Sequence, residues 1–219
     1  MVVRERFQLD LDELQAKLLE LGRLADVALK SSIEALETKN IELALQIMDD
    51  DAAVDALYEE INDFAILLIA KQAPVAIDLR RIIVAIKIAT DIERIADFAV
   101  NVAKSTIRIG KEEHVKPITQ VKEMYNITSE MLGLSLKAFS EEDVVIAKQV
   151  ADMDDEVDAL YGSTIRELLE LNRDNPEAIG QITQLSFTCR YLERAADHVT
   201  NIAESIFYLV KGRHYDLND

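Results

Sequence analysis

Residues that interrupt helices or form cross-links are scarce in this chain of 219 residues. It has six glycines and three prolines, too few for the many tight turns of an all-β fold. Its one cysteine, Cys189, excludes an intrachain disulfide and is typical of a reducing compartment. Basic residues are also in the minority. The 24 lysines and arginines stand against 41 acidic residues, and the net charge of −17 argues against a protein that binds nucleic acid.

Long apolar stretches are lacking as well. The longest run, Phe64 to Ala70, is far shorter than the roughly 20 residues that a membrane-spanning helix needs. Residues 1–6 include two arginines and offer no apolar stretch of the kind found in signal peptides. We therefore expect a cytoplasmic protein.

Helix-forming residues are abundant, and their spacing predicts an all-α protein. Asn40 is a candidate N-cap for the second helix, and Pro74 should end that helix. The segment Ser140-Glu-Glu-Asp143 resembles a capping box that starts the fifth helix, and Asn172 to Pro176 is a turn signal that ends it. The helices are predicted at about residues 10–37, 40–71, 76–109, 118–138 and 140–172, with a sixth that ends at about residue 211.

The sequence contains an internal repeat. Ile92-Glu-Arg-Ile-Ala-Asp97 returns as Leu192-Glu-Arg-Ala-Ala-Asp197, 100 residues later. A second pair of segments, Asp51 to Tyr58 and Asp154 to Tyr161, is 103 residues apart. The duplication predicts two antiparallel three-helix bundles, one domain at residues 1–110 and another at residues 117–219, joined by a charged link.

Pairs of acids recur at equivalent places in both halves. Two carboxylates four residues apart lie on one face of a helix, where their repulsion costs about 0.2–0.5 kcal/mol per pair. Either a bound cation or a solvated surface with ordinary ion pairs, for instance from Arg94 and Arg194, can offset this cost. Asn101 and Asn201 extend the stripe by one turn, and amide and carboxylate oxygens together suit a hard cation. The acids concerned are Asp51, Asp55, Glu93, Asp97, Asp154, Asp158, Glu193 and Asp197.

A known family shares these motifs. The string from Tyr191 to Glu204, its degenerate copy from Asp91 to Ala103, and Gln72-Ala-Pro-Val-Ala-Ile-Asp-Leu-Arg80 resemble the PhoU family, whose members are accessory proteins of phosphate transport. The resemblance extends over nearly the whole chain. It implies two three-helix bundles and a non-enzymatic regulatory adaptor that restrains the phosphate regulon and phosphate ABC transport when phosphate is plentiful.

The same resemblance implies ligands and partners. Glu93, Asp97, Glu193 and Asp197 would be the main ligands of multinuclear iron or zinc clusters, and the remaining four acids would complete the set. The implied partners are a second copy in a homodimer, the ATPase of the phosphate ABC transporter and the phosphate sensor kinase, so the membrane would be met only through partners.

Two other classes of protein remain as alternatives. A di-iron carboxylate enzyme on a helical bundle usually carries Glu-x-x-His motifs, whereas Ala96 and Ala196 stand three residues after Glu93 and Glu193. A purely structural helical module would leave all the acids solvated. His198 directly follows Asp197 and so points about 100° away from it on a helix, which favours a buried or partner-facing role over metal ligation.

Overall fold

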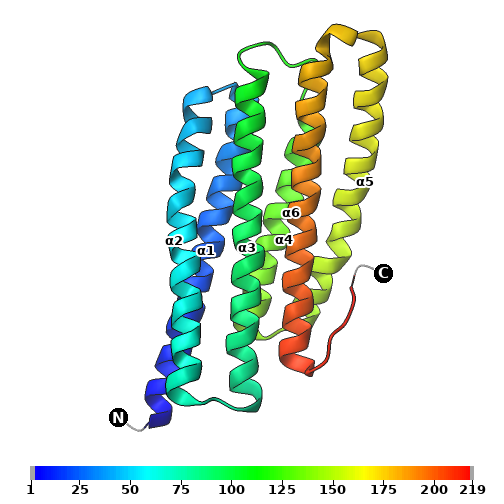
Figure 1. Cartoon of the computed structure of the whole chain (residues 1–219). Coiled ribbons are helices and arrows are strands. Elements are labelled where there is room, and N and C mark those ends of the chain that lie inside the picture. Colours follow the sequence, from blue (N-terminus) through cyan, green and yellow to red (C-terminus); the bar gives the residue numbers. More distant parts are fainter. Residues whose placement is uncertain (1–2, 218–219) are drawn as a thin grey trace.

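The computed structural model describes residues 3–217, and all regular structure in that range is helical. The all-α prediction is therefore confirmed. Six long helices run alternately up and down (Figure 1), with a single 3-10 turn, Pro176–Ala178, before the last of them. The helices are α1 (Val3–Thr38), α2 (Ile41–Gln72), α3 (Ala76–Ile109), α4 (Thr119–Glu141), α5 (Val144–Asp174) and α6 (Ile179–Lys211).

Side-chain caps stabilise the starts of two helices, α2 and α5. Asn40 caps α2 as predicted, because its side-chain oxygen accepts a hydrogen bond of 3.0 Å from the backbone N–H of Leu43. The predicted capping box at Ser140 is wrong. Ser140 lies within α4, and the N-cap of α5 is Asp143, whose carboxylate accepts from the N–H groups of Val145 and Ile146. Three further boundaries also differ: α1 begins at Val3 rather than near residue 10, α4 ends at Glu141 rather than near residue 138, and α5 continues to Asp174.

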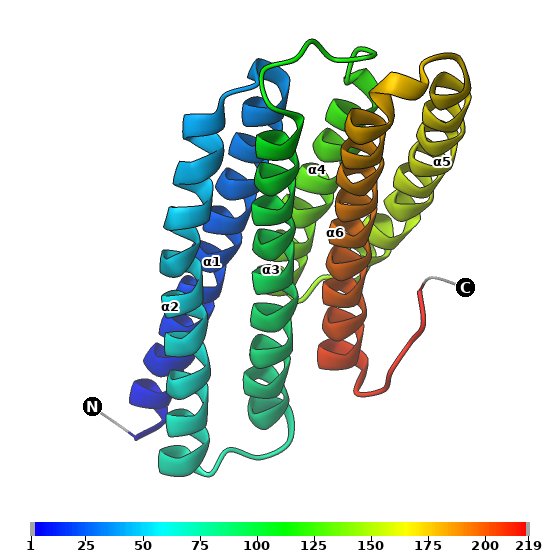
Figure 2. The same ribbon diagram turned by 45° about the horizontal axis from the view of Figure 1, so that its top comes forward.

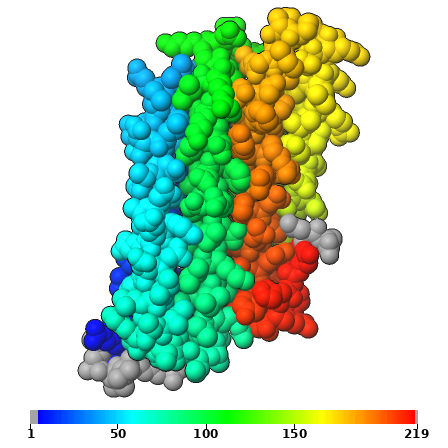
Figure 3. Space-filling model, in the orientation of Figure 1, coloured from blue at the N-terminus to red at the C-terminus, as the bar shows by residue number. Residues whose placement is uncertain are grey.

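The helices form two groups of three, α1–α3 and α4–α6, as the internal duplication predicts. Within each group the third helix packs against the other two, and the groups meet where α3 lies against α6 and α1 against α4 (Figures 1 and 2). Helices α2, α3, α6 and α5 lie side by side on the face seen in Figure 3. This arrangement places the helices that carry the repeated acids on one side of the molecule.

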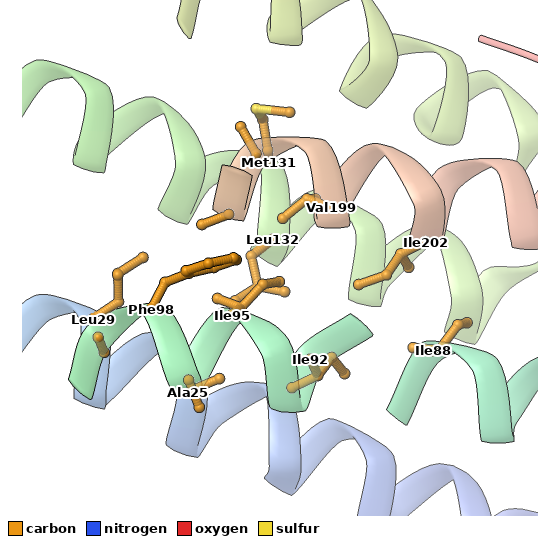
Figure 4. Packing of buried hydrophobic residues seen from close by; sticks show 14 of the residues in the cluster. Ala25, Leu29, Ile88, Ile92, Ile95, Phe98, Met131, Leu132, Val199 and Ile202 are labelled. Carbon is orange, nitrogen blue, oxygen red and sulfur yellow. The ribbon is translucent and has the colours of Figure 1, made fainter. Parts of the chain in front are cut away.

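A continuous apolar core joins the two groups. Ile95 of α3 points toward Leu132 of α4 and Val199 of α6, and Ala25 of α1 lies on the other side of α3 (Figure 4). Ile92 of α3 belongs to the same core. All five side chains are almost fully buried. The link at residues 110–117 connects the groups, but the core runs through both, so the division into domains 1–110 and 117–219 stays a prediction.

No helix within residues 3–217 combines the length and the apolar character needed to cross a membrane.

Candidate functional site

The first candidate group comprises the four acids of α2 and α3: Asp51, Asp55, Glu93 and Asp97. The structure brings them together, since the charges of the acids on one helix act on those of the other. Burial, with the charges of Asp55 and Asp97, raises the pKa of Asp51. Burial, with the charge of Asp97, raises the pKa of Glu93. The sequence placed each pair on one helix face, and the packing of α2 on α3 makes the pairs neighbours.

The second group, Asp154, Asp158, Glu193 and Asp197, repeats the arrangement between α5 and α6. Burial raises the pKa of Asp154 to about 7, and Asp158, Asp197 and Glu193 add to the effect. Burial also raises the pKa of Asp158 and of Glu193, in both cases with the charge of Asp197. Burial and the gathering of like charges make this an environment in which a cation would be stabilised.

The second group lies deeper than the first. Asp154 is only 7% exposed and Glu193 only 8% exposed. The Oε2 atom of Glu193 is buried and finds no hydrogen-bond partner among residues 3–217. A buried carboxylate oxygen without a partner is costly, and it is explained if the acid receives a ligand.

Arginines form ion pairs with some of these carboxylates. The arginine that does so stands at a different position in each half. Arg94 reaches both acids of its own helix, with Nη1 at 2.8 Å from Asp97 and Nε at 3.4 Å from Glu93. Arg194 stands at the equivalent place in the second half, yet its guanidinium lies over the ring of Phe98, 5.5 Å from the ring centre. Glu193 is paired instead with Arg190, one turn earlier.

Residues beside the acids join the two halves. His198 donates a hydrogen bond from Nδ1 to Oδ1 of Asp91 at 2.9 Å, because a carboxylate can only accept. The amide of Asn201 donates to the same oxygen at 3.4 Å. His198 therefore points away from Asp197 into the seam between α3 and α6, as its position predicts. Asn201 is likewise engaged with the other half rather than with the acids of its own helix.

Carboxylate oxygens are suitable ligands for a hard cation, although the oxygens of these acids do not converge on one point in the structure. Within residues 3–217, no group of three or more His, Cys, Asp or Glu side chains is arranged to hold a metal ion as the structure stands. The arginine pairs and the mutual repulsion of the acids give a physical reason for this spread. Metal ligation by the eight acids therefore stays a prediction, supported by the unpartnered oxygen of Glu193.

Comparison with known proteins identifies the family. The model of the PhoU domain matches the chain twice, at residues 18–106 and 121–206. The chain belongs to the PhoU family. A phosphate-specific transport system accessory protein PhoU homolog of Clostridium acetobutylicum is 39% identical over 219 residues, which is 100% of both chains. An Aquifex aeolicus homolog with the same description is 36% identical over 93% of this chain and 92% of its own.

Solved structures of PhoU proteins have the same fold. The crystal structure of PhoU from Pseudomonas aeruginosa matches with a TM-score of 0.90 and 31% identity, over 94% of this chain and 100% of that one. The phosphate transport system regulatory protein PhoU from Streptococcus pneumoniae also gives a TM-score of 0.90, with 30% identity, over 96% and 99% of the two chains. The two-bundle architecture expected from the resemblance is thus confirmed.

Two residues of this region could not be recognised from the sequence. Arg190 occupies the position of Thr90 in the first repeat, and Asp91 that of Tyr191, so neither recurs. Only the packing shows that Arg190 pairs with Glu193 and that Asp91 receives His198. The only sign of them in the sequence is that the residue type differs between the two repeats at these positions. The two halves have different neighbouring side chains there.

Proposed function

We propose that this protein is a regulatory adaptor of bacterial phosphate homeostasis and not an enzyme. The observation that carries the proposal is the match of the PhoU domain to both repeats, together with full-length similarity to accessory proteins of phosphate-specific transport. The adaptor would restrain the phosphate regulon and phosphate uptake when phosphate is plentiful. It would act in the cytoplasm and reach the membrane only through its partners.

The two acidic groups would bind multinuclear clusters of iron or zinc. Asp51 and Asp55 would provide ligands from α2, and Glu93 and Asp97 from α3. Asp154, Asp158, Glu193 and Asp197 would do the same from α5 and α6. The metal would supply positive charge that offsets the repulsion among the carboxylates, and it would cross-link neighbouring helices. The buried, unpartnered oxygen of Glu193 supports this part of the proposal.

The proposed partners are proteins. They are a second copy of the chain, the ATPase of the phosphate ABC transporter and the phosphate sensor kinase. The strongly acidic surface supports protein partners over nucleic acid, since a net charge of −17 repels phosphate backbones.

A strain that lacks this chain tests the regulatory role. Deletion should raise the expression of phosphate-scavenging genes in phosphate-rich medium, and reintroduction of the chain should restore repression. A pull-down from native lysate under the same conditions should recover the transporter ATPase or the sensor kinase. Normal repression in the deletion strain would contradict the proposal.

A further inference from the structure

In each acidic group an arginine forms ion pairs with some of the carboxylates, and the number of these ion pairs differs between the two groups. Arg94 contacts two of the four acids in the first group, Glu93 and Asp97. Direct ion pairs therefore hold two of the four acids in the first group.

The second group has fewer direct ion pairs than the first. Its one direct cation is Arg190, which contacts Glu193 through Oε1 and leaves Oε2 without a partner among residues 3–217. Arg194, the counterpart of Arg94, is drawn to the ring of Phe98 instead. The position of Lys104 is taken by Glu204, whose carboxylate accepts a hydrogen bond from the backbone of Leu217. The charge of Arg194 still acts on Glu193, but Arg194 forms no direct ion pair with the described acids. Direct ion pairs therefore hold two acids of the first group and one of the second.

A metal ion and a guanidinium compete for the same lone pairs. A carboxylate oxygen that ligates a cation loses most of its capacity to accept from arginine, and two positive charges beside one oxygen repel each other. Arg94 and Arg190 are about half exposed, with side-chain exposures of 53% and 48%, so both have room to move into solvent. Movement of either side chain would place a positive charge on an otherwise acidic face.

We propose that Arg94 and Arg190 compete with a metal ion for the carboxylates, and that metal binding displaces them. Because fewer carboxylates of the second group are paired with arginine, the second group would bind metal with higher affinity than the first. The inference rests on the proposed metal binding and adds the order of filling and the residues that set it. It also gives the adaptor a means of signalling, because a guanidinium released by metal becomes available to a partner protein.

Zinc titration by calorimetry of the full-length protein, stripped with chelator, tests this. In Glu93→Gln/Asp97→Asn only the second group remains, and it should bind zinc more tightly than the first group does in Glu193→Gln/Asp197→Asn. Arg94→Gln should then tighten the first group, and Arg190→Gln the second, by about two- to fivefold, the range expected for the loss of one exposed ion pair. Arg94→Lys and Arg190→Lys keep the charge and should restore affinities near those of the wild type.

Arg194→Gln is the matched control, because Arg194 has the same side chain and helix position as Arg94 but lies over Phe98. It should change zinc affinity least. As an independent readout, the side-chain N–H signals of Arg94 and Arg190 in nuclear magnetic resonance spectra should shift when zinc is added, and that of Arg194 should move much less.

The results distinguish failure of the proposed metal sites from failure of the proposed competition with arginine. If the wild type binds no zinc or iron at either group, the proposed metal clusters fail. If the wild type binds zinc but Arg94→Gln and Arg190→Gln bind no more tightly than Arg194→Gln, the competition is wrong while the metal sites stand. Tighter binding by the first group than by the second would overturn the proposed order of filling.

Discussion

Phe98 and His198 hold the same position in the two repeats, and their rings meet across the seam between α3 and α6, with centres 5.8 Å apart. Each ring directly follows the second acid of its repeat, Asp97 or Asp197. The two acidic groups are therefore separated by a short path through packed side chains. His198 also carries the hydrogen bond to Asp91, so one residue supplies both a ring contact and a polar contact between the halves.

Substitutions of His198 should separate these two contacts. His198→Phe keeps a ring beside Phe98 but removes the hydrogen bond to the largely buried Asp91, and we expect a loss of about 1–2 kcal/mol in the free energy of unfolding. His198→Ala removes both contacts and should lose more. Urea denaturation in the presence of chelator measures the difference. Equal stability of wild type and His198→Phe would show that the bond to Asp91 contributes nothing.

Two helical glycines should respond in different ways to alanine. At Gly133 an added Cβ would meet, within 4 Å, no described atom beyond its chain neighbours and the nearby backbone of its own helix, so Gly133→Ala should stabilise α4 by roughly 0.5–1 kcal/mol. At Gly22 the same atom would lie 2.5 Å from Cδ1 of Leu136, where α1 packs on α4. Leu136 must then move, and Gly22→Ala should be at least about 1 kcal/mol less stable than Gly133→Ala. Thermal melts of both variants test this, and equal melting temperatures would mean that the contact adapts freely.

The stability of the metal-free protein should fall as the pH rises toward neutrality. The pKa of Asp154 is raised from 3.8 to about 7 in the folded state, so the folded protein binds the proton more tightly than the unfolded chain does. Its contribution is fully present below about pH 4 and is lost as the pH rises to about 7. Since a tenfold change in proton binding corresponds to about 1.4 kcal/mol, the loss is at most about 4 kcal/mol.

Asp154→Asn should flatten this profile, because the amide stays neutral throughout. Urea denaturation from pH 5 to pH 8 in chelator measures the free energy of unfolding of both proteins. Glu156→Gln serves as the control, because Glu156 is an exposed acid of the same helix outside the acidic group, and this variant should keep the slope of the wild type. A wild-type profile that rises across this range would contradict the assigned pKa.

Loss of acids in one half should remove metal from that half alone. Glu93→Ala/Asp97→Ala should lose about half of the bound metal, and Glu193→Ala/Asp197→Ala should lose the other half. If free metal is at 100 times its Kd, binding adds about 2.7 kcal/mol to stability, so each variant should melt lower than wild type only when metal is present. Without metal, removal of the like charges should leave the stability within about 0.5 kcal/mol. Equal metal content in all three proteins, with melting insensitive to chelator, would favour the solvated surface.

Self-association is expected in solution. Light scattering at micromolar concentration should give a mass above the 24.6 kDa of one chain, near twice that value for the proposed homodimer. A mass of one chain at all concentrations up to that range would contradict it.

The sequence by itself determined the features that depend on near neighbours along the chain. The scarcity of glycine and proline and the apolar periodicity specify six long helices. Asn40 caps α2 through a bond to a residue three positions away, and α3 begins and ends where the sequence predicts, at Ala76 and Ile109. The i,i+4 spacing likewise determines that Glu93 and Asp97 share one helix face.

Tertiary structure decided what depends on contacts between distant segments. The sequence repeats Arg94 as Arg194, yet the first pairs with acids and the second lies over Phe98, because the two halves meet different neighbours when α3 packs against α6. The contact between Asp91 and His198 spans 107 positions of the chain. Helix periodicity carries no information about such distances, whereas the packing of six helices on one core determines both the contacts and the depth at which Asp154 and Glu193 are buried.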